Sequence, residues 1–207
     1  MAISDRNIFL ASRSPRRREL LRQIGVGHDV LLLREDPKRG ADVDETPHAG
    51  ETPRGYALRV ATAKASAGLQ IAARRAGGMI KPVLAADTTI ALDDAIIGKP
   101  GDAVDAARIL KALSGRSHRV ITAITMAFAE RLETRVSEST VTMSVLDDAL
   151  IERYIATGEP MDKAGAYAVQ GRAAAFITRI DGSYSGIMGL PLAETVELLA
   201  AFDIASV

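Results

Sequence analysis

The sequence of 207 residues contains no cysteine and only three histidines. The absence of cysteine excludes a disulfide framework, a thiolate metal site and a cysteine nucleophile. The 26 basic residues balance the 26 acidic ones, so the formal net charge is zero. A broad electrostatic grip on a nucleic acid polymer or on an anionic membrane is therefore not expected, and any anion site must be local.

Long apolar runs and several well-known motifs are also missing. No apolar run approaches the length of a membrane span, and the first residues, MAISDRN, lack a charged-then-apolar leader pattern. These features favour a cytoplasmic protein without a membrane partner. The chain has no Walker phosphate loop, no dinucleotide-binding glycine fingerprint and no His-Glu-x-x-His. His28, His48 and His118 are dispersed, which argues against a histidine metal site or a Ser-His-Asp triad.

Strand and helix signals alternate along the chain, without long linkers, repeats or low-complexity tracts. This alternation predicts a compact α/β fold. The predicted strands cover residues 8–11, 28–33, 82–86, 90–92, 95–97, 119–129 and 135–145, and the predicted helices cover residues 15–24, 53–76, 103–113, 148–157 and 192–202. We interpret residues 1–207 as a single domain. A division into two lobes, with the second beginning near residue 100, stays open.

The start of the first predicted helix carries three adjacent arginines. Ser14 is a suitable N-cap and Pro15 suits the first helical position. A helix start offers unpaired backbone N–H groups and a positive dipole end, so Arg16 and Arg17 beside it predict a phosphate site. A solvated basic face is the alternative for an isolated run of arginines.

Asp87 ends the apolar run of residues 83–86. Ligand sites in open α/β sheets lie beyond the carboxyl ends of the strands, which makes Asp87 a candidate site residue. A hairpin that turns at residues 93–94 would fold Lys99 back towards Asp87. The same patterns also fit an aspartate that caps a turn and an ordinary turn lysine.

Three further polar residues are candidates. Lys64 lies among alanines that let a ligand approach closely, although a surface lysine is the alternative. Glu45 belongs to an acidic cluster whose ordinary interpretation is a solvated loop. Gln170 follows a glycine-rich stretch and can both donate to and accept from a base edge, although an amide that stitches a loop together is the default. Carboxylates combined with Arg and Lys suit metal-assisted attack of water on phosphorus.

Six motifs, in one order and spanning nearly the whole chain, resemble the Maf family. They are LASRSPRRRELL at 10–21, AADT at 85–88, GKP at 98–100, LSGRSH at 113–118, GEPMDKAGAY at 158–167 followed by Gln170-Gly171, and GLP at 189–191. Each motif alone is weak, whereas the six together are highly specific.

The resemblance implies a cytoplasmic nucleoside triphosphate pyrophosphatase that uses a divalent cation, Mg²⁺ or Mn²⁺. It implies an α/β fold with a mixed twisted sheet, flanking helices and two lobes around a central cleft, and a homodimer. Carried onto this chain, the catalytic residues are Asp87, Lys64 and Lys99; the substrate-binding residues are Ser12, Ser14, Arg16 and Arg17; and the metal ligands are Glu45 and Asp87. Asp44 or Glu35 stays open as the acidic partner, because residues 34–42 are longer than the family pattern.

The resemblance extends to one branch of the family, which acts on dTTP and UTP. Asp87-Thr88 together with Gln170 matches that branch, whereas the 7-methyl-GTP branch has Asp-Gln at the first of these places. Arg16, Thr88 and Gln170 are then the implied specificity positions. Two other functions stay open at this point: a regulator of septum formation that acts through protein contacts, and a nucleotide sensor that binds without hydrolysis.

Overall fold

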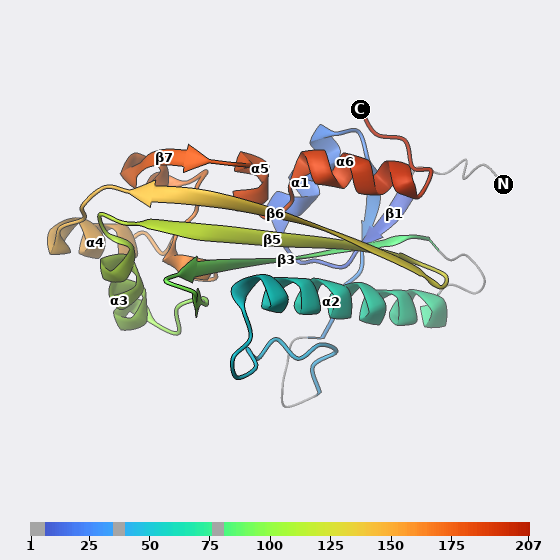
Figure 1. Ribbon diagram of the computed structural model, residues 1–207, viewed down its shortest axis with the longest axis horizontal. Coiled ribbons are helices and arrows are strands. Elements are labelled where there is room, and N and C mark those ends of the chain that lie inside the picture. The colour runs from blue at the N-terminus through green and yellow to red at the C-terminus, as the bar shows by residue number, and fades with distance from the viewer. Residues whose placement is uncertain (1–6, 35–39, 76–80) are drawn as a thin grey trace.

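A computed structural model describes residues 7–34, 40–75 and 81–207. A single seven-stranded mixed sheet carries the fold, with the strand order β2-β1-β3-β5-β6-β7 and with β4 paired to β3 (Figure 1). The pairs β1–β2 and β1–β3 are parallel, and the remaining pairs are antiparallel. The mixed α/β fold class expected from the sequence is therefore confirmed.

The strands are β1 (Asn7–Leu10), β2 (Gly27–Val30), β3 (Val83–Leu92), β4 (Ala95–Ile97), β5 (Ser117–Phe128), β6 (Arg131–Met143) and β7 (Ile177–Asp181). The helices are α1 (Pro15–Gln23), α2 (Pro53–Arg75), α3 (Ala103–Leu113), α4 (Asp148–Ile155), α5 (Tyr184–Ile187) and α6 (Leu192–Ala201), with 3₁₀ helices η2 (Ala164–Ala166) and η3 (Arg172–Phe176). The sequence did not predict β7 or α5. None of the described helices is both long and apolar enough to cross a bilayer.

The strand β3 differs from the prediction in a way that matters for the site. Residues 82–86 and 90–92 were expected as separate strands, yet residues 83–91 pair continuously with β5. The Asp-Thr-Thr triplet between the two apolar runs does not break the strand, because threonine is a good strand former. Asp87 consequently lies in the middle of β3, and its expected place at a carboxyl strand end is wrong.

The other side of β3 is left partly open. There, β1 pairs with Val83 and Leu84, and β4 pairs with residues 90–92. Among the described residues, no strand pairs with residues 85–89 on this side. We call this stretch the open edge; it lies between the two ends of the molecule.

The helices cover both faces of the sheet (Figure 1). The α2 face packs against Val83 and Ala85, whereas Leu84 and Ala86 belong to the core beneath α1 and α6. Because side chains alternate along a strand, Asp87 faces α2 and Thr88 faces the opposite side. A further apolar cluster fills the end of the molecule around α3, α4 and η2. The long strands run through both ends, and the division into two lobes stays a prediction.

Candidate active site

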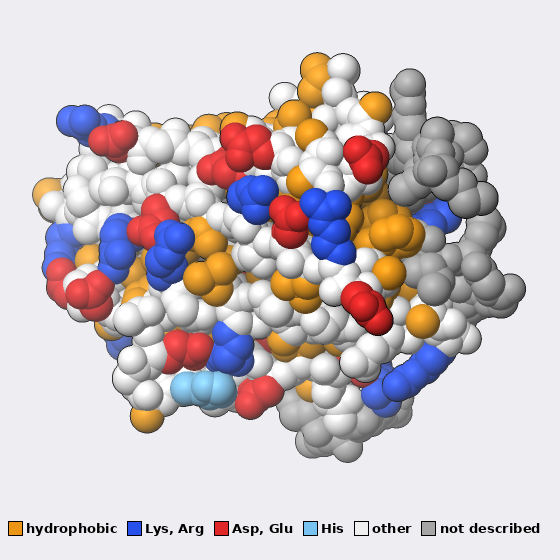
Figure 2. Space-filling model, turned by 45° about the vertical axis from the view of Figure 1, so that its right-hand side comes forward, with side chains coloured by type: hydrophobic (Ala, Val, Ile, Leu, Met, Phe, Trp, Pro, Cys, Tyr) orange, Lys and Arg blue, Asp and Glu red, His pale blue; other side chains and the backbone are white. Residues whose placement is uncertain are grey.

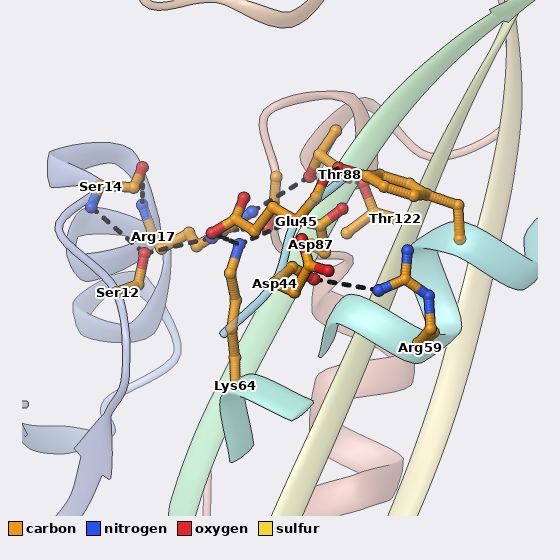
Figure 3. Close-up of polar contacts among 12 residues, drawn as sticks. Ser12, Ser14, Arg17, Asp44, Glu45, Arg59, Lys64, Asp87, Thr88 and Thr122 are labelled. Carbon is orange, nitrogen blue, oxygen red and sulfur yellow. Dashed lines mark hydrogen bonds and ion pairs between the residues drawn. The ribbon is translucent and has the colours of Figure 1, made fainter. Parts of the chain in front are cut away.

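Three of the predicted residues meet at the open edge (Figure 3). Lys64, on α2, places its Nζ 2.8 Å from Asp87 Oδ1 and 3.1 Å from Glu45 Oε1. The side chains of Lys64 and Asp87 are 14% and 9% exposed, whereas that of Glu45 is 41% exposed. The second carboxylate oxygen, Asp87 Oδ2, is buried and has no hydrogen-bond partner among the described residues. The site therefore contains a largely buried ion pair and a free buried acceptor.

Small residues on α2 allow Lys64 to reach Asp87. Ala57, Ala61 and Ala65 are buried against the sheet. Gly68 lies one turn beyond Lys64, and a Cβ atom there would be only 2.8 Å from Val83 Cγ1. The helix thus lies close enough to the sheet for a lysine on it to reach a carboxylate on β3.

The loop that carries Glu45 is held by two residues of α2 that the sequence analysis missed. The Tyr56 hydroxyl donates to the carbonyl of Glu45 at 2.9 Å. Arg59 donates to the carbonyls of Asp44 and Thr46 at 3.0 and 2.9 Å. The i, i+3 spacing of Tyr56 and Arg59, on one helix face beside a long polar loop, is the signal that could have found them.

The contacts at this loop also shift the pKa values of the side chains that make them. Hydrogen bonds from Arg59 are the main reason that the pKa of the Glu51 carboxyl is lowered to about 2. The Arg59 guanidinium, whose pKa is raised by the same pair, accordingly stays fixed to the loop. Burial raises the pKa of the Tyr56 hydroxyl, and the charges of Asp87 and Glu45 add to the effect.

The structure separates the alternatives for the acidic partner of Asp87. Asp44 Oδ1 accepts a hydrogen bond from the backbone N–H of Thr46 at 2.8 Å, so its carboxylate serves a local turn. Glu45 is the neighbour that contacts Lys64. Glu35 lies outside the described residues. This placement supports Glu45 over Asp44.

Arg17 is tied into the site by three hydrogen bonds from its guanidinium. Its Nε donates to the carbonyl of Gly189 at 2.7 Å, its Nη1 to Ser12 Oγ at 3.1 Å and its Nη2 to Thr88 Oγ1 at 3.2 Å. Ser14 caps α1 as predicted, because its Oγ accepts from the backbone N–H of Arg17. Burial lowers the pKa of Arg17, while Asp87 acts in the opposite direction and keeps a cation at this position favourable.

Neighbouring Arg16 is half-buried, and its pKa is lowered by burial alone. Two of the five N–H groups of Arg17 are left for another acceptor after its three bonds. The two arginines thus place positive charge at the start of α1, next to the ion pair of Lys64 and Asp87.

Thr88 is joined to neighbouring groups by hydrogen bonds, and its role in base selection stays a prediction. Its Oγ1 lies 2.9 Å from Thr122 Oγ1, which in turn donates to the carbonyl of Gly186 at 2.8 Å. A hydroxyl has a single proton, so Thr122 gives its proton to Gly186, and Thr88 donates to Thr122 while accepting from Arg17. Thr122 lies within a long apolar strand, and nothing in the sequence marks it as a site residue. In this arrangement Thr88 orients Arg17.

Lys99 and Gln170 are exposed, and in the described part of the chain neither side chain forms a hydrogen bond or an ion pair. The structure does not bring them into contact with Asp87. Their loops do contact each other, because the backbone N–H of Gly165 donates to the carbonyl of Gly98 at 3.0 Å. The roles of Lys99 and Gln170 stay predictions.

Comparison with known proteins decides the family. Residues 7–202 match the family described as Maf-like protein. The chain belongs to the Maf family. A protein named dTTP/UTP pyrophosphatase from Aromatoleum aromaticum is 57% identical over 94% of this chain and 95% of its own length. A protein with the same name from Nitrosomonas europaea is 53% identical over 93% of this chain and 92% of its own length. Another from Dechloromonas aromatica is 50% identical over 93% of this chain and 95% of its own length.

Among solved structures, the Staphylococcus aureus Ham1 protein aligns over 95% of this Maf chain and 97% of its own, with a TM-score of 0.47 and 17% identity.

Two of the Maf motifs contact each other in the structure. His118 Nε2 and the Tyr167 hydroxyl are 2.8 Å apart, and their rings meet edge to face at 5.4 Å. Burial lowers the pKa of His118 to about 4. His118 is thus a neutral structural partner within the Maf fold.

The donor set of this Maf site is suited to a particular kind of metal binding. The described residues contain no group of three or more His, Cys, Asp or Glu side chains that could hold a metal ion. Two carboxylates, Glu45 and Asp87, do converge on Lys64, and Asp87 Oδ2 is a buried acceptor without a partner. Mg²⁺ is commonly held by one or two carboxylates together with substrate phosphates. The residues therefore fit a divalent ion that binds together with a triphosphate.

Proposed function

We propose that this protein hydrolyses nucleoside triphosphates, with dTTP and UTP preferred, to the nucleoside monophosphate and pyrophosphate. The observation that carries the proposal is the unpartnered Oδ2 of Asp87, buried beside Lys64 at the open edge of β3. Relatives named dTTP/UTP pyrophosphatase support it, since they are 50–57% identical over nearly the whole chain.

In this reaction a water oxygen forms a bond to the α-phosphorus, and the bond from that phosphorus to the bridging oxygen of the leaving pyrophosphate breaks. Asp87 positions the attacking water and accepts its proton. Lys64 holds Asp87 by Oδ1, so that the carboxylate has a defined direction. Arg16 and Arg17 bind phosphate oxygens at the start of α1, and Ser12 and Ser14 shape the same loop.

Lys99 stabilises charge that develops on the leaving group. This assignment needs the loop of residues 98–100 to approach the substrate, because Lys99 is exposed and has no partner in the described residues. The favourable feature is the open solvent around Lys99, which leaves its ammonium group available to a polyanion.

A divalent cation, Mg²⁺ or Mn²⁺, would be held by Glu45 and Asp87 together with the phosphates. When bound, it polarises the phosphoryl oxygens and offsets their negative charge. The positioning of Glu45 beside Lys64 at 3.1 Å supports this donor pair. A cation that arrives with the substrate would also relieve the repulsion between two carboxylates and a triphosphate.

The base would be selected by Gln170, whose amide matches the carbonyl oxygens and the N–H of a uracil or thymine edge. Thr88 contributes indirectly, through its hydrogen bond to Arg17. Acidic and basic side chains are interspersed on the face shown in Figure 2, and the net charge of the chain is zero. This mixed surface favours a small anionic substrate over a nucleic acid polymer. A homodimer in the cytoplasm is part of the proposal.

The test is a panel of dTTP, UTP, CTP, ATP, GTP and 7-methyl-GTP with Mg²⁺ or Mn²⁺, in which pyrophosphate and the monophosphate are both measured. We expect the two products in equal amounts, with dTTP and UTP giving the highest kcat/KM. Asp87→Asn should lower kcat by about two orders of magnitude or more, as for removal of a catalytic carboxylate. Asp203→Asn, at an exposed position with positive φ that asparagine tolerates, is the matched control.

Near wild-type turnover by Asp87→Asn would refute the role of Asp87. Tight triphosphate binding without product would instead favour a nucleotide sensor. Similar kcat/KM values for pyrimidine and purine triphosphates would refute the proposed preference for dTTP and UTP while leaving the pyrophosphatase activity intact.

A further inference from the structure

The exposed side chain of Gln170 lies between two anchored segments. On its N-terminal side, Tyr167 is bonded to the buried His118 of β5 at 2.8 Å, and Ala168 and Val169 are buried. On its C-terminal side, the backbone of residues 171–173 contacts the carboxylate of Glu159. Glu159 has no role in the proposed reaction. Gln170 is therefore an exposed residue on a backbone that is fixed at both ends.

Both oxygens of Glu159 are engaged in fixing the second end. Its Oε2 accepts a hydrogen bond from the backbone N–H of Arg172 at 3.0 Å, and its Oε1 accepts one from the N–H of Ala173 at 3.3 Å. The Tyr154 hydroxyl, from α4, also donates to Oε1 at 2.9 Å. Burial raises the pKa of Glu159, but these hydrogen bonds outweigh it and the pKa is lowered. The group is thus a charged acceptor that joins α4 to the start of η3.

Gly171 is required by this contact. A Cβ atom on Gly171 would lie 2.3 Å from Oε1 and 2.6 Å from Oε2 of Glu159. The φ angle of Gly171 is −100°, which any residue can adopt, so the glycine is needed for space. The carboxylate of Glu159 therefore lies directly against the backbone that follows Gln170.

We propose that Glu159 is a positioning residue for base selection, and that it acts by holding the backbone next to Gln170. The inference rests on the proposed function, in which the amide of Gln170 contacts the base. A side chain attached to a fixed backbone loses less conformational freedom on binding than a side chain on a mobile loop. Replacing one of the Glu159 oxygens that contact the backbone of residues 171–173 should therefore weaken binding of the matching base. It should leave the chemical step unchanged.

The experiment compares Glu159→Gln with Glu152→Gln, the same change at an exposed position of α4. A glutamine at position 159 keeps the shape but replaces one acceptor oxygen with an NH₂ group, which cannot accept from a backbone N–H. We expect the ratio of kcat/KM for UTP to kcat/KM for ATP to fall about tenfold, on the scale of one charge-assisted hydrogen bond. The change should come from a higher KM for UTP, with kcat within about twofold of wild type.

Two further measurements separate positioning from a general loss of structure. Hydrogen exchange should become faster at the amides of residues 171–173 in Glu159→Gln and stay unchanged in Glu152→Gln. Gly171→Ala should lower the UTP to ATP ratio in the same way, because its Cβ would displace the carboxylate. In a Gln170→Ala background, Glu159→Gln should cause no further loss of selectivity, since the residue through which it acts is gone.

An unchanged ratio in both Glu159→Gln and Gly171→Ala, alongside a reduced ratio in Gln170→Ala, would overturn the inference and leave the proposed function in place. An equal further loss in the Gln170→Ala background would also overturn it. If Gln170→Ala itself leaves the ratio unchanged, the role of Gln170 fails and the inference fails with it. Absence of pyrophosphate from every nucleotide in the wild-type protein would refute the proposed function itself.

Discussion

Protonation of the buried His118 should make the stability of this protein depend on pH in a defined way. The side chain is 3% exposed, its Nε2 contacts Tyr167, and its Nδ1 is buried without a hydrogen-bond partner in the described residues. Burial lowers its pKa from 6.5 to about 4. The folded state therefore favours the neutral imidazole, whereas the unfolded chain takes up a proton near pH 6.5.

The sign of the effect follows from the number of bound protons. Between pH 6.5 and about 4 the unfolded state binds more protons than the folded state, so the free energy of unfolding rises with pH in this window. The contribution of His118 is complete above pH 6.5 and is lost as the pH falls towards 4. With those two pKa values the loss amounts to about 2 kcal/mol at pH 5 and about 3 kcal/mol at pH 4.

Urea unfolding of the wild type and of His118→Gln at pH 5.0 and pH 7.5 measures the contribution of His118 to the free energy of unfolding. The wild-type protein should lose about 2 kcal/mol more than the variant between the two pH values. Carboxylates titrate in both proteins and cancel in the comparison. His48→Gln, at an exposed position, is the control and should behave like the wild type. Parallel losses in the wild type and His118→Gln would refute the reasoning.

Other substitutions test the site and the packing beneath it. Lys64→Ala and Lys99→Ala should each lower kcat about 10²- to 10³-fold if the two lysines stabilise charge in the transition state, and a rise in KM alone would show that they bind only the ground state. Gly68→Ala should lower the free energy of unfolding by about 1 kcal/mol, because overpacking against Val83 outweighs the gain in helix propensity. Its control is Gly101→Ala, where a Cβ meets nothing within 4 Å, and equal urea midpoints for the two variants would contradict the packing argument.

Local signals in the sequence predicted much of the secondary structure. Ser14 is expected as a helix cap, and in the structure its Oγ accepts a hydrogen bond from the backbone N–H of Arg17, three residues on. The turn at residues 93–94, where both aspartates have positive φ, was also expected. These features are predictable because a cap or a tight turn depends on a few adjacent residues.

Predictions that depended on distant pairing were less successful. The polar triplet at 87–89 was read as the end of a strand, yet β5 pairs with it throughout. The motif that contains Thr88 gave no indication that its hydroxyl contacts Arg17 and Thr122, residues 71 and 34 positions away. Glu159 gave no separate signal, because a charged residue in a polar segment is usually solvated.

The sequence by itself determined the kind of chemistry and the family, because residue types and ordered motifs are properties of the chain alone. It named Asp87, Lys64 and Glu45, and the structure shows them in contact. Only the tertiary structure decided that they meet on the α2 side of β3, in the stretch that neither β1 nor β4 covers. The physical reason is that strand pairing and helix packing join residues far apart in the chain, and they determine which polar atoms are buried, paired or left without a partner.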